Sequence, residues 1–499
     1  MTDAPSGQRR GSVVVIGGGV GGLAAAIRLA AAGHPVTLFE RNDEFGGKLG
    51  VRRRDGYCFD TGPSLITLPS VFEELFAAAG RRLHDHVELI ELSPQFRYHW
   101  PDGTTRDMPG NPEADAAHVD QLDRFLAAGD AMWDVSERTF FAGAMSGPLS
   151  LARRMRSPRD LTTIRPFTTL HSFARRQLDD PQLVQWASRY ATYSGSSPFR
   201  APATLACIPA IEARYGCWYS RGGLGVLRDA IVELARAVGV ELVARADVAR
   251  IRLHPTRSRP IPMTCHQVTV ATQVRGVELS DGTFHPADIV IANVDADHLY
   301  GDLLPDPKAL RRVRRAPRST SGLAILAGVT GATEGLAHHN VWFSADYQRE
   351  FAQLTAGEPA DDPTVYACVS SITDPSQAPV SHENWFILVN TPPRPDRVPR
   401  EYADLVLDRL AARGVDLAGR VEFTEVITPA DIEARFRSRG GAIYGSSSDG
   451  KRAAFLRPGN RGSCRGLYLA GGSSHPGGGL PLVLMSARIV ADMIAADGW

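Results

Sequence analysis

The sequence predicts an α/β fold of two domains, in which a Rossmann-like domain carries a parallel sheet and a mixed α+β domain completes the molecule. Three observations predict this fold. The chain has 499 residues, whereas a single hydrophobic core usually stops growing at about 250 to 300 residues. A β-branched run followed by a glycine-rich turn lies near the N-terminus. A second apolar run with a glycine-rich turn lies near the C-terminus.

The composition excludes several classes of protein. Lys and Arg (55 together) balance Asp and Glu (55), so no overall charge attracts a nucleic acid, and we predict no nucleic-acid partner. The six cysteines are scattered, which excludes a C-x-x-C redox pair and fits a reducing cytoplasm. Five glycines between Gly17 and Gly22 interrupt the N-terminal apolar stretch, so we predict neither a signal peptide nor a membrane-spanning helix.

The first predicted element is a strand, a tight turn and a helix. Residues 13 to 16 form a β-branched run of the kind that is buried in a parallel sheet. Gly17, Gly19 and Gly22 then match G-x-G-x-x-G, in which glycines allow a tight turn and a close approach of the backbone to a pyrophosphate. The unpaired N–H groups at the start of the helix favour a phosphate there. We therefore predict that this turn binds a dinucleotide.

The second predicted strand supplies an acid at the distance that this motif requires. Residues 36 to 39 form an apolar run that ends at Glu40, eighteen positions after Gly22. A carboxylate at this place accepts hydrogen bonds from an adenosine ribose and repels a 2′-phosphate, which argues against NADP. The alternative is a glycine-rich turn that serves only for packing.

The residues after Glu40 resemble those of the FAD-dependent oxidoreductases of the phytoene desaturase type. In that family the acid is followed by a second glycine pair, here within residues 46 to 48, and by an aromatic-Asp-Thr-Gly-Pro stretch, here residues 59 to 63. The resemblance implies that the cofactor is FAD. With the fingerprint, it implies these cofactor-binding residues: Gly17, Gly19, Gly21, Gly22, Glu40, Arg41, Gly46, Gly47, Lys48, Gly62, Pro63, Ser64, Val248, Gly471, Gly472, Pro476, Gly477, Gly479 and Leu480.

The C-terminal glycine cluster is also similar to this family. Residues 467 to 470 form an apolar run, residues 471 and 472 a turn, and Pro481 suits the first turn of a helix because its missing N–H is not needed there. The resemblance implies that this cluster returns to the first domain and closes over the flavin end of FAD. Many related flavoproteins, amine oxidases among them, carry an acid at this turn. Here residues 473 to 475 read Ser-Ser-His, which favours the desaturase branch.

The middle of the chain divides the predicted FAD-binding domain into three parts. Apolar residues at helical spacing between 227 and 238 precede a strand at 240 to 243, and the resemblance implies that the backbone near Val248 meets the adenine. We predict an FAD-binding domain of residues 11–110, 215–300 and 425–499, and a substrate-binding domain of residues 111–214 and 301–424.

A basic and apolar segment lies inside the predicted substrate-binding domain. Residues 153 to 176 hold seven arginines and one acid, interleaved with Met155, Leu161, Ile164, Phe167, Leu170 and Phe173. Arginines among apolar residues suit a surface in the headgroup layer of a membrane, whereas the alternative is a solvated basic helix pair over an ordinary core. Because the resembled family acts on lipid-soluble substrates, we predict a cytoplasmic protein that is peripheral on the inner face of the cell membrane.

The resemblance implies a desaturase that introduces double bonds into a lipophilic carotenoid precursor, such as phytoene or a later acyclic carotenoid, by hydride transfer to flavin N5. Such a substrate has no polar handle, so a long apolar tunnel must bind it. His475 is the candidate catalytic residue, for loss of the neighbouring proton, and its alternative role is a structural hydrogen bond. Without a second dinucleotide fingerprint, we expect oxygen or a membrane quinone as electron acceptor.

The sequence leaves other activities open. Within the same family the alternatives are an FAD-dependent carotenoid isomerase and a late-step desaturase of hydroxylated or methoxylated intermediates of the neurosporene type. An amine oxidase and a prenyl-lipid binding protein without FAD are more distant alternatives. His338 and His339 have no third ligand at regular spacing, so we predict packing roles and no metal site. The number of subunits is not determined by the sequence.

Overall fold

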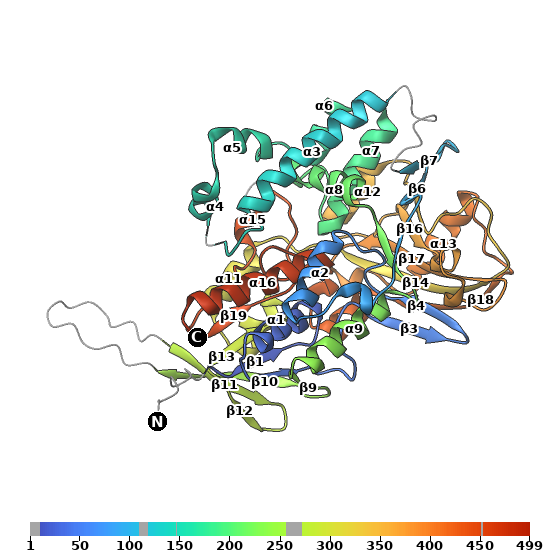
Figure 1. Cartoon of the computed structure of the whole chain (residues 1–499). Helices are drawn as coiled ribbons and strands as arrows, with labels where there is room; N and C mark the ends of the chain where they lie inside the picture. The colour runs from blue at the N-terminus through green and yellow to red at the C-terminus, as the bar shows by residue number, and fades with distance from the viewer. Residues whose placement is uncertain (1–9, 109–117, 146, 256–271, 451–452) are drawn as a thin grey trace, which may run out of the picture.

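A parallel sheet of five strands gathers segments from both ends and the middle of the chain (Figure 1). The computed structural model describes residues 10–108, 118–145, 147–255, 272–450 and 453–499. The strand order is β19–β13–β1–β2–β9, and every neighbouring pair is parallel. The strands are β1 (Val13–Ile16), β2 (Val36–Phe39), β9 (Glu241–Val243), β13 (Ile289–Ala292) and β19 (Leu467–Leu469).

Both faces of the parallel sheet are covered, which explains its β-branched, fully buried strands. Val13 and Val15 of β1 share a core with α1 (Val20–Ala31), α9 (Leu224–Ala237) and α16 (Leu480–Ala496). Val14 and Ile16 point the other way, since side chains alternate along a strand. They pack under an antiparallel sheet of β10 (Val248–Pro255), β11 (Thr272–Leu279) and β12 (Phe284–Pro286).

A second, seven-stranded sheet has the order β18–β14–β17–β16–β15–β6–β7. Its long strands carry continuous apolar runs, and α13 (Tyr402–Ala412) covers one face. The strands are β6 (Phe96–His99), β7 (Thr105–Met108), β14 (Ser321–Thr330), β15 (His339–Trp342), β16 (Val365–Cys368), β17 (His382–Thr391) and β18 (Val421–Ile427).

A layer of helices lies over the sheets at the top of Figure 1. It consists of α3 (Val119–Thr139), α4 (Pro148–Arg154), α5 (Pro158–Ile164), α6 (Leu170–Gln177), α7 (Pro181–Arg189) and α8 (Cys207–Tyr215). The remaining helices are α2 (Pro69–Ala78), α10 (Ala296–His298), α11 (Pro307–Arg315), α12 (Tyr347–Ala356), α14 (Pro429–Phe436) and α15 (Ala453–Leu456). Two antiparallel pairs complete the strands: β3 (Val51–Arg54) with β4 (Tyr57–Asp60), and β5 (Leu89–Glu91) with β8 (Trp218–Ser220).

The α/β fold class and the elements on which it was predicted are confirmed. The two N-terminal strands lie where the sequence placed them, and Pro481 lies in the first turn of α16. The division into domains stays a prediction, but strand pairing corrects one limit: β6 and β7, assigned to the first domain within residues 11–110, belong to the seven-stranded sheet. Only long-range pairing decides to which sheet a short strand belongs.

Two expectations from composition can be compared with the described residues. The five cysteines in this part of the chain are free, and Cys265 lies outside it. Among the helices described, none combines the length and the apolar character that a bilayer crossing requires.

Candidate functional site

The two glycine-rich turns lie against each other. A methyl group on Gly21, in the first turn of α1, would come within 2.9 Å of the Cα atom of Gly471, which follows β19. Asn293, directly after β13, lies between them: its side-chain amide donates to the carbonyl oxygen of Gly17 at 3.0 Å, and its Oδ1 fills the space that a side chain at Gly471 would need. The fold therefore brings both ends of the chain to one place, as the sequence predicted.

The starts of two helices border one cavity of about 810 Å³. The residues that precede α1 and α16, Gly19 and Gly479, give no side-chain hydrogen bond to the helix start. Both glycines line the cavity, and a methyl group on Gly479 would meet no atom within 4 Å. An uncapped helix start on a glycine-lined strip suits a phosphate, because its N–H groups and the helix dipole favour an anion.

Glu40 closes one end of this strip at the tip of β2. Its Oε2 accepts from the Gly18 N–H at 2.7 Å, and its Oε1 accepts from the backbone N–H and the side-chain amide of Asn42 at 2.9 and 2.6 Å. Glu40 lines the cavity together with Val248. The carboxylate therefore fixes the glycine turn, and its remaining lone pairs are left for the ribose that the motif predicts.

The second glycine pair packs on the first glycine turn. The Gly46 N–H donates to the Gly18 carbonyl oxygen at 2.8 Å, and a methyl group on Gly47 would lie 2.9 Å from the Cα atom of Gly19. Arg41 lines the same part of the cavity and donates to a backbone carbonyl of α14 at 2.7 Å. The loop that the resemblance assigned to the pyrophosphate is thus in contact with the helix start that suits a pyrophosphate.

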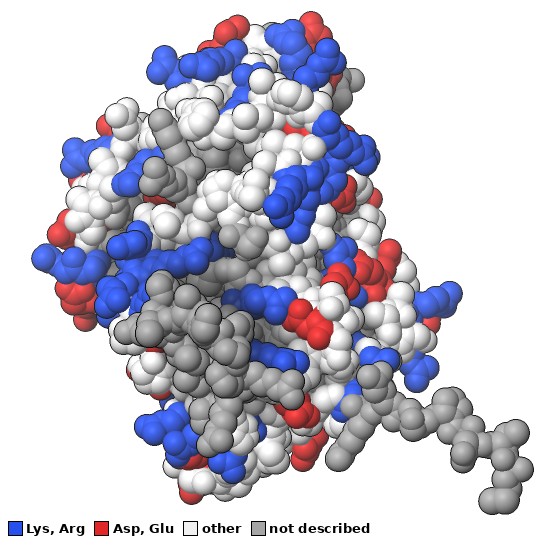
Figure 2. Space-filling model, turned by 90° about the vertical axis from the view of Figure 1, so that its left-hand side faces the viewer, with Lys and Arg blue, Asp and Glu red and all other residues white. Residues whose placement is uncertain are grey.

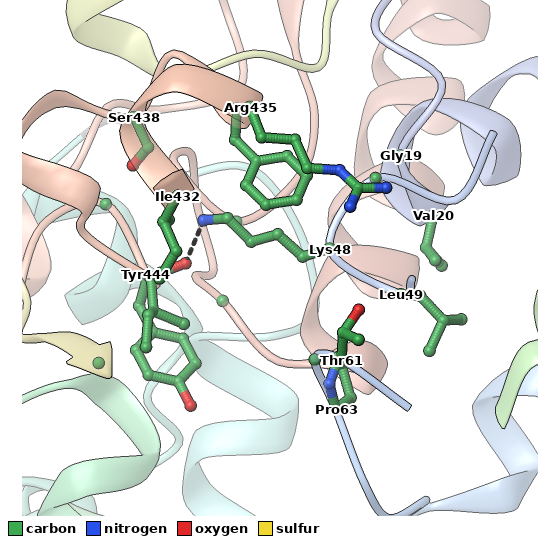
Figure 3. Close-up of a pocket in the computed structure, with 18 of the residues that line it drawn as sticks. Gly19, Val20, Lys48, Leu49, Thr61, Pro63, Ile432, Arg435, Ser438 and Tyr444 are labelled. Atoms are coloured by element: carbon green, nitrogen blue, oxygen red, sulfur yellow. Dashed lines mark hydrogen bonds between the residues drawn. The ribbon is translucent and has the colours of Figure 1, made fainter. Parts of the chain in front are cut away.

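Lys48 and Gly62 are in direct contact beside this loop. A methyl group on Gly62 would lie 1.8 Å from the Lys48 carbonyl oxygen, so only glycine fits. The Lys48 ammonium donates to the Ile443 carbonyl at 2.5 Å, and Figure 3 shows this side chain reaching toward the segment that carries Tyr444, with Pro63 on the other side. Burial lowers the pKa of Lys48 to about 8. An anionic ligand would favour the charged form again.

Most of the predicted cofactor-binding residues line the cavity: Gly17, Gly19, Gly21, Glu40, Arg41, Gly46, Gly47, Lys48, Gly62, Pro63, Ser64, Val248, Gly472, Gly479 and Leu480. The residues present therefore fit FAD, for which the resemblance implies the adenosine at Glu40 and the flavin toward Gly62. Gly22, Gly471, Pro476 and Gly477 do not line it. Gly22 packs against the Gly17 carbonyl and Gly471 against Asn293. These two glycines therefore allow the close packing of the turns without lining the cavity themselves.

His475, the candidate catalytic residue, does not line the cavity. It is 1% exposed, its Nε2 lies 2.9 Å from the carbonyl oxygen of Phe140, and the two rings pack edge to face at 4.6 Å. Burial lowers the pKa of His475 to about 4, so the ring is neutral near pH 7. These contacts favour the structural alternative, since the hydrogen bond ties the C-terminal turn to the end of α3, and the catalytic role stays a prediction.

The sequence analysis missed an acid that lies at the C-terminal turn. Asp295, from the loop after β13, lines the cavity beside Ser473, whose hydroxyl accepts from the Ala296 N–H at 2.9 Å. Arg318 pairs with the Asp295 carboxylate at 3.0 Å, and the two side chains are 10% and 5% exposed. The turn itself carries no acid, but the loop after the neighbouring strand β13 supplies one. A single Asp in a loop gives no sequence signal for this position.

Arg457 is a second residue that sequence reasoning missed. Its guanidinium is buried and donates to the carbonyl oxygens of Gly472, Tyr444 and Ser446 at 2.8, 3.1 and 2.5 Å. Burial lowers the pKa of Arg457 to about 10, which leaves it charged at neutral pH. One cation therefore holds three carbonyls from two loops, next to the C-terminal glycine turn.

The other half of the cavity is bounded by the seven-stranded sheet and α14. Because side chains alternate along β14, Leu323 and Ile325 pack under α13 while Gly322 and Ala324 face the cavity. The small side chains leave room for a ligand. The apolar lining residues of this half are Phe96, Gly322, Ala324, Phe386, Leu388, Ile427, Ile432, Phe436 and Ile443.

The predicted apolar tunnel is wrong in one respect, because buried polar residues also line this half. Arg189 and Glu350 are 8% and 2% exposed and both border the cavity. Tyr366 joins them, and its hydroxyl oxygen lies 2.5 Å from Ser64 Oγ, in the segment assigned to the flavin. Burial raises the pKa of Glu350, which favours its neutral form.

His338 and His339 are buried, as a packing role requires, but they lie next to Cys368. The ligand-capable atoms of the three side chains lie within 4.8 Å of one another. The Nδ1 atoms of the two histidines lie 2.8 Å from Thr373 Oγ1 and 2.9 Å from Tyr366 Oη, respectively. Spacing along the chain could not reveal Cys368, because it comes from the neighbouring strand. The absence of a metal stays a prediction.

Curated relatives of this chain cover nearly its whole length. It is 36% identical to a 4,4'-diapolycopene oxygenase of Methylomonas sp (97% of this chain, 98% of the relative). It is 34% identical to a 1-hydroxycarotenoid 3,4-desaturase of Flavobacterium sp. (96% and 98%) and 33% identical to a 4,4'-diaponeurosporene oxygenase of Staphylococcus aureus (97% and 98%). These relatives confirm the resemblance to desaturase-type FAD oxidoreductases.

Solved structures and a family model agree on the fold. A putrescine oxidase superposes with a TM-score of 0.65 at 15% identity (98% and 99% of the two chains), and a fatty acid isomerase from P. acnes with 0.60 at 14% (99% and 100%). At these identities the likeness shows the fold alone. The model described as flavin containing amine oxidoreductase matches residues 20–495. The chain therefore belongs to the flavin containing amine oxidoreductase family and is an oxidoreductase whose cofactor is FAD.

Proposed function

We propose that the chain is an FAD-dependent desaturase of carotenoids, which removes two hydrogens from adjacent saturated carbons of a polyene and leaves a double bond. The observation that carries the proposal is that two kinds of lining belong to the same cavity. Its glycine-lined half fits FAD, and apolar side chains of β14, β17 and α14 bound its other half. The names of the relatives, which specify diapolycopene, diaponeurosporene and a 1-hydroxycarotenoid, support the substrate class.

FAD held in this cavity would supply the two-electron oxidation: of the two hydrogens that leave the substrate, one would be taken up as a hydride at N5 and the other released to solvent as a proton. The chain itself binds and orients. The start of α1 and the Gly46–Gly47 loop would hold the pyrophosphate, and Glu40 would hold the ribose. The apolar wall excludes water from the polyene beside the Gly62 segment, so that water does not enter the place where the polyene would react. We propose oxygen or a membrane quinone as the acceptor that takes the two electrons away.

The test is to mix the FAD-loaded protein with a panel of polyenes in liposomes, without oxygen. A substrate should bleach the flavin absorbance, and its product should absorb at longer wavelength because one more conjugated double bond has formed. A product of unchanged bond number but altered geometry would support the isomerase instead. If no polyene bleaches the flavin of a folded, FAD-loaded protein, the proposed function is wrong.

A second candidate is the introduction of oxygen into the polyene. Two of the three relatives named above are called oxygenases, and this is the observation that favours it. The two reactions differ in the product: an oxygenated product gains mass and requires molecular oxygen, whereas desaturation removes two hydrogens with any acceptor. Mass spectrometry of the product separates them.

An amine oxidase activity is disfavoured by the charge of the cavity. Arg189 is buried there, and no carboxylate of the described residues forms an ion pair with it. A protonated amine would have to enter next to this cation. Glu350, which also lines the cavity, has a pKa that burial raises, so it attracts a cation less than an ionised carboxylate would.

We propose that α4, α5 and the turn after α5 dock on a membrane surface. Leu149, Leu161 and Phe167 are 64%, 47% and 76% exposed. Exposed arginines surround them, and Figure 2 shows basic side chains around uncharged surface on the face that carries α4 and α5. Leu170 and Phe173, which also belong to the basic and apolar segment of residues 153 to 176, are buried in the core instead. Apolar tips among arginines suit an interface with anionic lipid.

A further inference from the structure

Helix α14 bounds the cavity on the side of the seven-stranded sheet, where it packs against β14, and two arginines tie its end to the glycine-lined half. Arg41 donates to the Ala434 carbonyl oxygen of α14 at 2.7 Å. Arg437, directly after α14, pairs with the carboxylate of Asp247 at 2.6 and 2.8 Å. These bonds join α14 to the loops that follow β2 and β9, so a helix from the second sheet borders the site of the dinucleotide.

Arg435, in the last turn of α14, also lines the cavity, but it forms no hydrogen bond or ion pair with any residue in the described part of the chain. Its guanidinium carbon lies 5.6 Å from the ring centre of Phe436, and its Nη2 lies 3.9 Å from the position of a methyl group on Gly50, shortly after the Gly46–Gly47 loop. Figure 3 shows this side chain pointing toward Gly19. Exposed arginines commonly lack partners, but this one extends over the glycine-lined half of the cavity.

The acids of α14 do not pair with Arg435, because each is bound elsewhere. Asp431 accepts from Arg400 at 3.0 Å. Glu433 accepts from the Gly440 N–H at 3.0 Å. A guanidinium stays protonated at any pH of interest, so Arg435 keeps its positive charge for a ligand.

The wall toward which Arg435 points is suited to a phosphate. Gly19 gives the start of α1 no side-chain hydrogen bond, so the N–H groups there favour an anionic ligand. The Lys48 ammonium, a second cation of this region, already donates to the Ile443 carbonyl oxygen at 2.5 Å. A guanidinium presents parallel N–H donors that match two oxygens of a phosphate. An anion between Gly19 and Arg435 would therefore be bound from both sides.

We infer that Arg435 binds the pyrophosphate of FAD, and that α14 thereby closes over the cofactor from the side opposite to the start of α1. The cofactor would then be held between elements of both sheets, and its release would require the Arg435 contact to break. The inference concerns cofactor binding alone. It therefore holds whichever substrate the FAD-loaded protein oxidises.

The experiment compares three ligands on the full-length protein from which FAD has been removed: FAD, ADP and adenosine. FAD and ADP both carry two linked phosphates, whereas adenosine carries none. Arg435→Gln should raise the Kd for FAD and for ADP by about tenfold each, because a charged hydrogen bond to phosphate is lost. It should change the Kd for adenosine by less than about twofold, since no such bond exists there. Isothermal titration calorimetry at low salt gives the three constants.

Two further variants test whether the charge at this position is what matters. Arg435→Lys keeps the charge without the planar donor pair, so it should restore part of the affinity for FAD and ADP. The matched control is Arg312→Gln, which removes the same charge from an exposed position on α11 outside the cavity lining. It should leave all three Kd values unchanged. The loss of ADP affinity caused by Arg435→Gln should also shrink as the salt concentration rises.

Unchanged Kd values for FAD and ADP in Arg435→Gln would overturn the inference. An equal loss for adenosine, or a loss for FAD without one for ADP, would overturn it as well, because Arg435 would then act on another part of the ligand. If the FAD-free protein does not stay folded, the rate of FAD release on dilution of the loaded protein carries the test, and Arg435→Gln should raise this rate by about tenfold.

These measurements separate the inference from the proposed function, because no polyene enters them. Wild-type affinity for FAD and ADP in Arg435→Gln would overturn the role of Arg435 and leave the polyene reaction untouched. A protein that binds FAD through Arg435 but whose flavin no polyene bleaches would contradict the proposed function alone.

Discussion

Gly21 and Gly471 touch across the centre of the molecule, 2.9 Å between the position of a Gly21 methyl group and the Gly471 Cα atom, although they lie near opposite ends of the chain. The contact places the starts of α1 and α16 on one cavity. Because of this contact, the two glycine-rich turns border a site for one ligand.

Gly21→Ala should weaken FAD binding and stability together. The new methyl group would lie 2.9 Å from both Gly471 Cα and Asn293 Oδ1, so the two turns must separate. Overpacking of this kind costs about 1 to 3 kcal/mol. Flavin absorbance per protein and the thermal midpoint measure the effect. In the control Gly301→Ala the nearest atom is 4.0 Å away, and both values should stay at the wild-type level. Full FAD content in Gly21→Ala would contradict the convergence.

Lys48 should make the stability of the FAD-free protein rise with pH. The folded chain releases the Lys48 proton at about pH 8, whereas the unfolded chain releases it near 10.5. Between these values the unfolded state holds more protons, so the free energy of unfolding increases with pH. Relative to Lys48→Met, the wild type should gain on the order of 1 to 3 kcal/mol across this window. Denaturant titrations at several pH values test this, and parallel profiles would refute it.

His475 should prove structural. His475→Ala leaves the half-buried Phe140 carbonyl without its partner, which should cost about 1 to 3 kcal/mol of stability. The rate of flavin reduction per bound FAD should change less than twofold in His475→Gln, which keeps a donor. Because burial lowers the pKa of His475 to about 4, this rate should show no His475 inflection near neutral pH. A hundredfold loss of rate in a folded, FAD-loaded His475→Gln would restore the catalytic role.

The membrane proposal predicts that Phe167→Asp combined with Leu161→Asp abolishes binding to anionic vesicles. Both substitutions place a charge where an exposed apolar side chain would enter the lipid. Co-sedimentation with vesicles at several salt concentrations measures the binding, which should also weaken as salt rises. The matched control is Val380→Asp, since Val380 is 92% exposed and lies outside α4 and α5. If it lowers binding equally, the surface has been assigned wrongly.

Local pattern was sufficient for much of the fold and the cofactor. Three local patterns each predicted a feature that the structure shows. They are the β-branched run before Gly17, the acid at Glu40 and the proline in the first turn of α16. These features can be predicted from the sequence because strand burial, helix starts and glycine turns depend on a few neighbouring residues.

Tertiary structure decided what no local pattern encodes. Asp295, Arg457 and Arg189 belong to no motif that the sequence reveals. The fold buries them beside the cavity, where each contributes to the charge of the site. His475 shows the reverse: its place in a glycine-rich cluster suggested chemistry, and packing against Phe140 directs it away from the cavity.

The sequence by itself thus determined that a dinucleotide binds and where each half of its site begins. Only the tertiary structure decided that Asn293 joins those halves and that a cation stands among the apolar walls. The physical reason is range: backbone conformation follows from neighbours along the chain, whereas burial, charge pairing and unpaired donors depend on residues that meet only when the chain is folded.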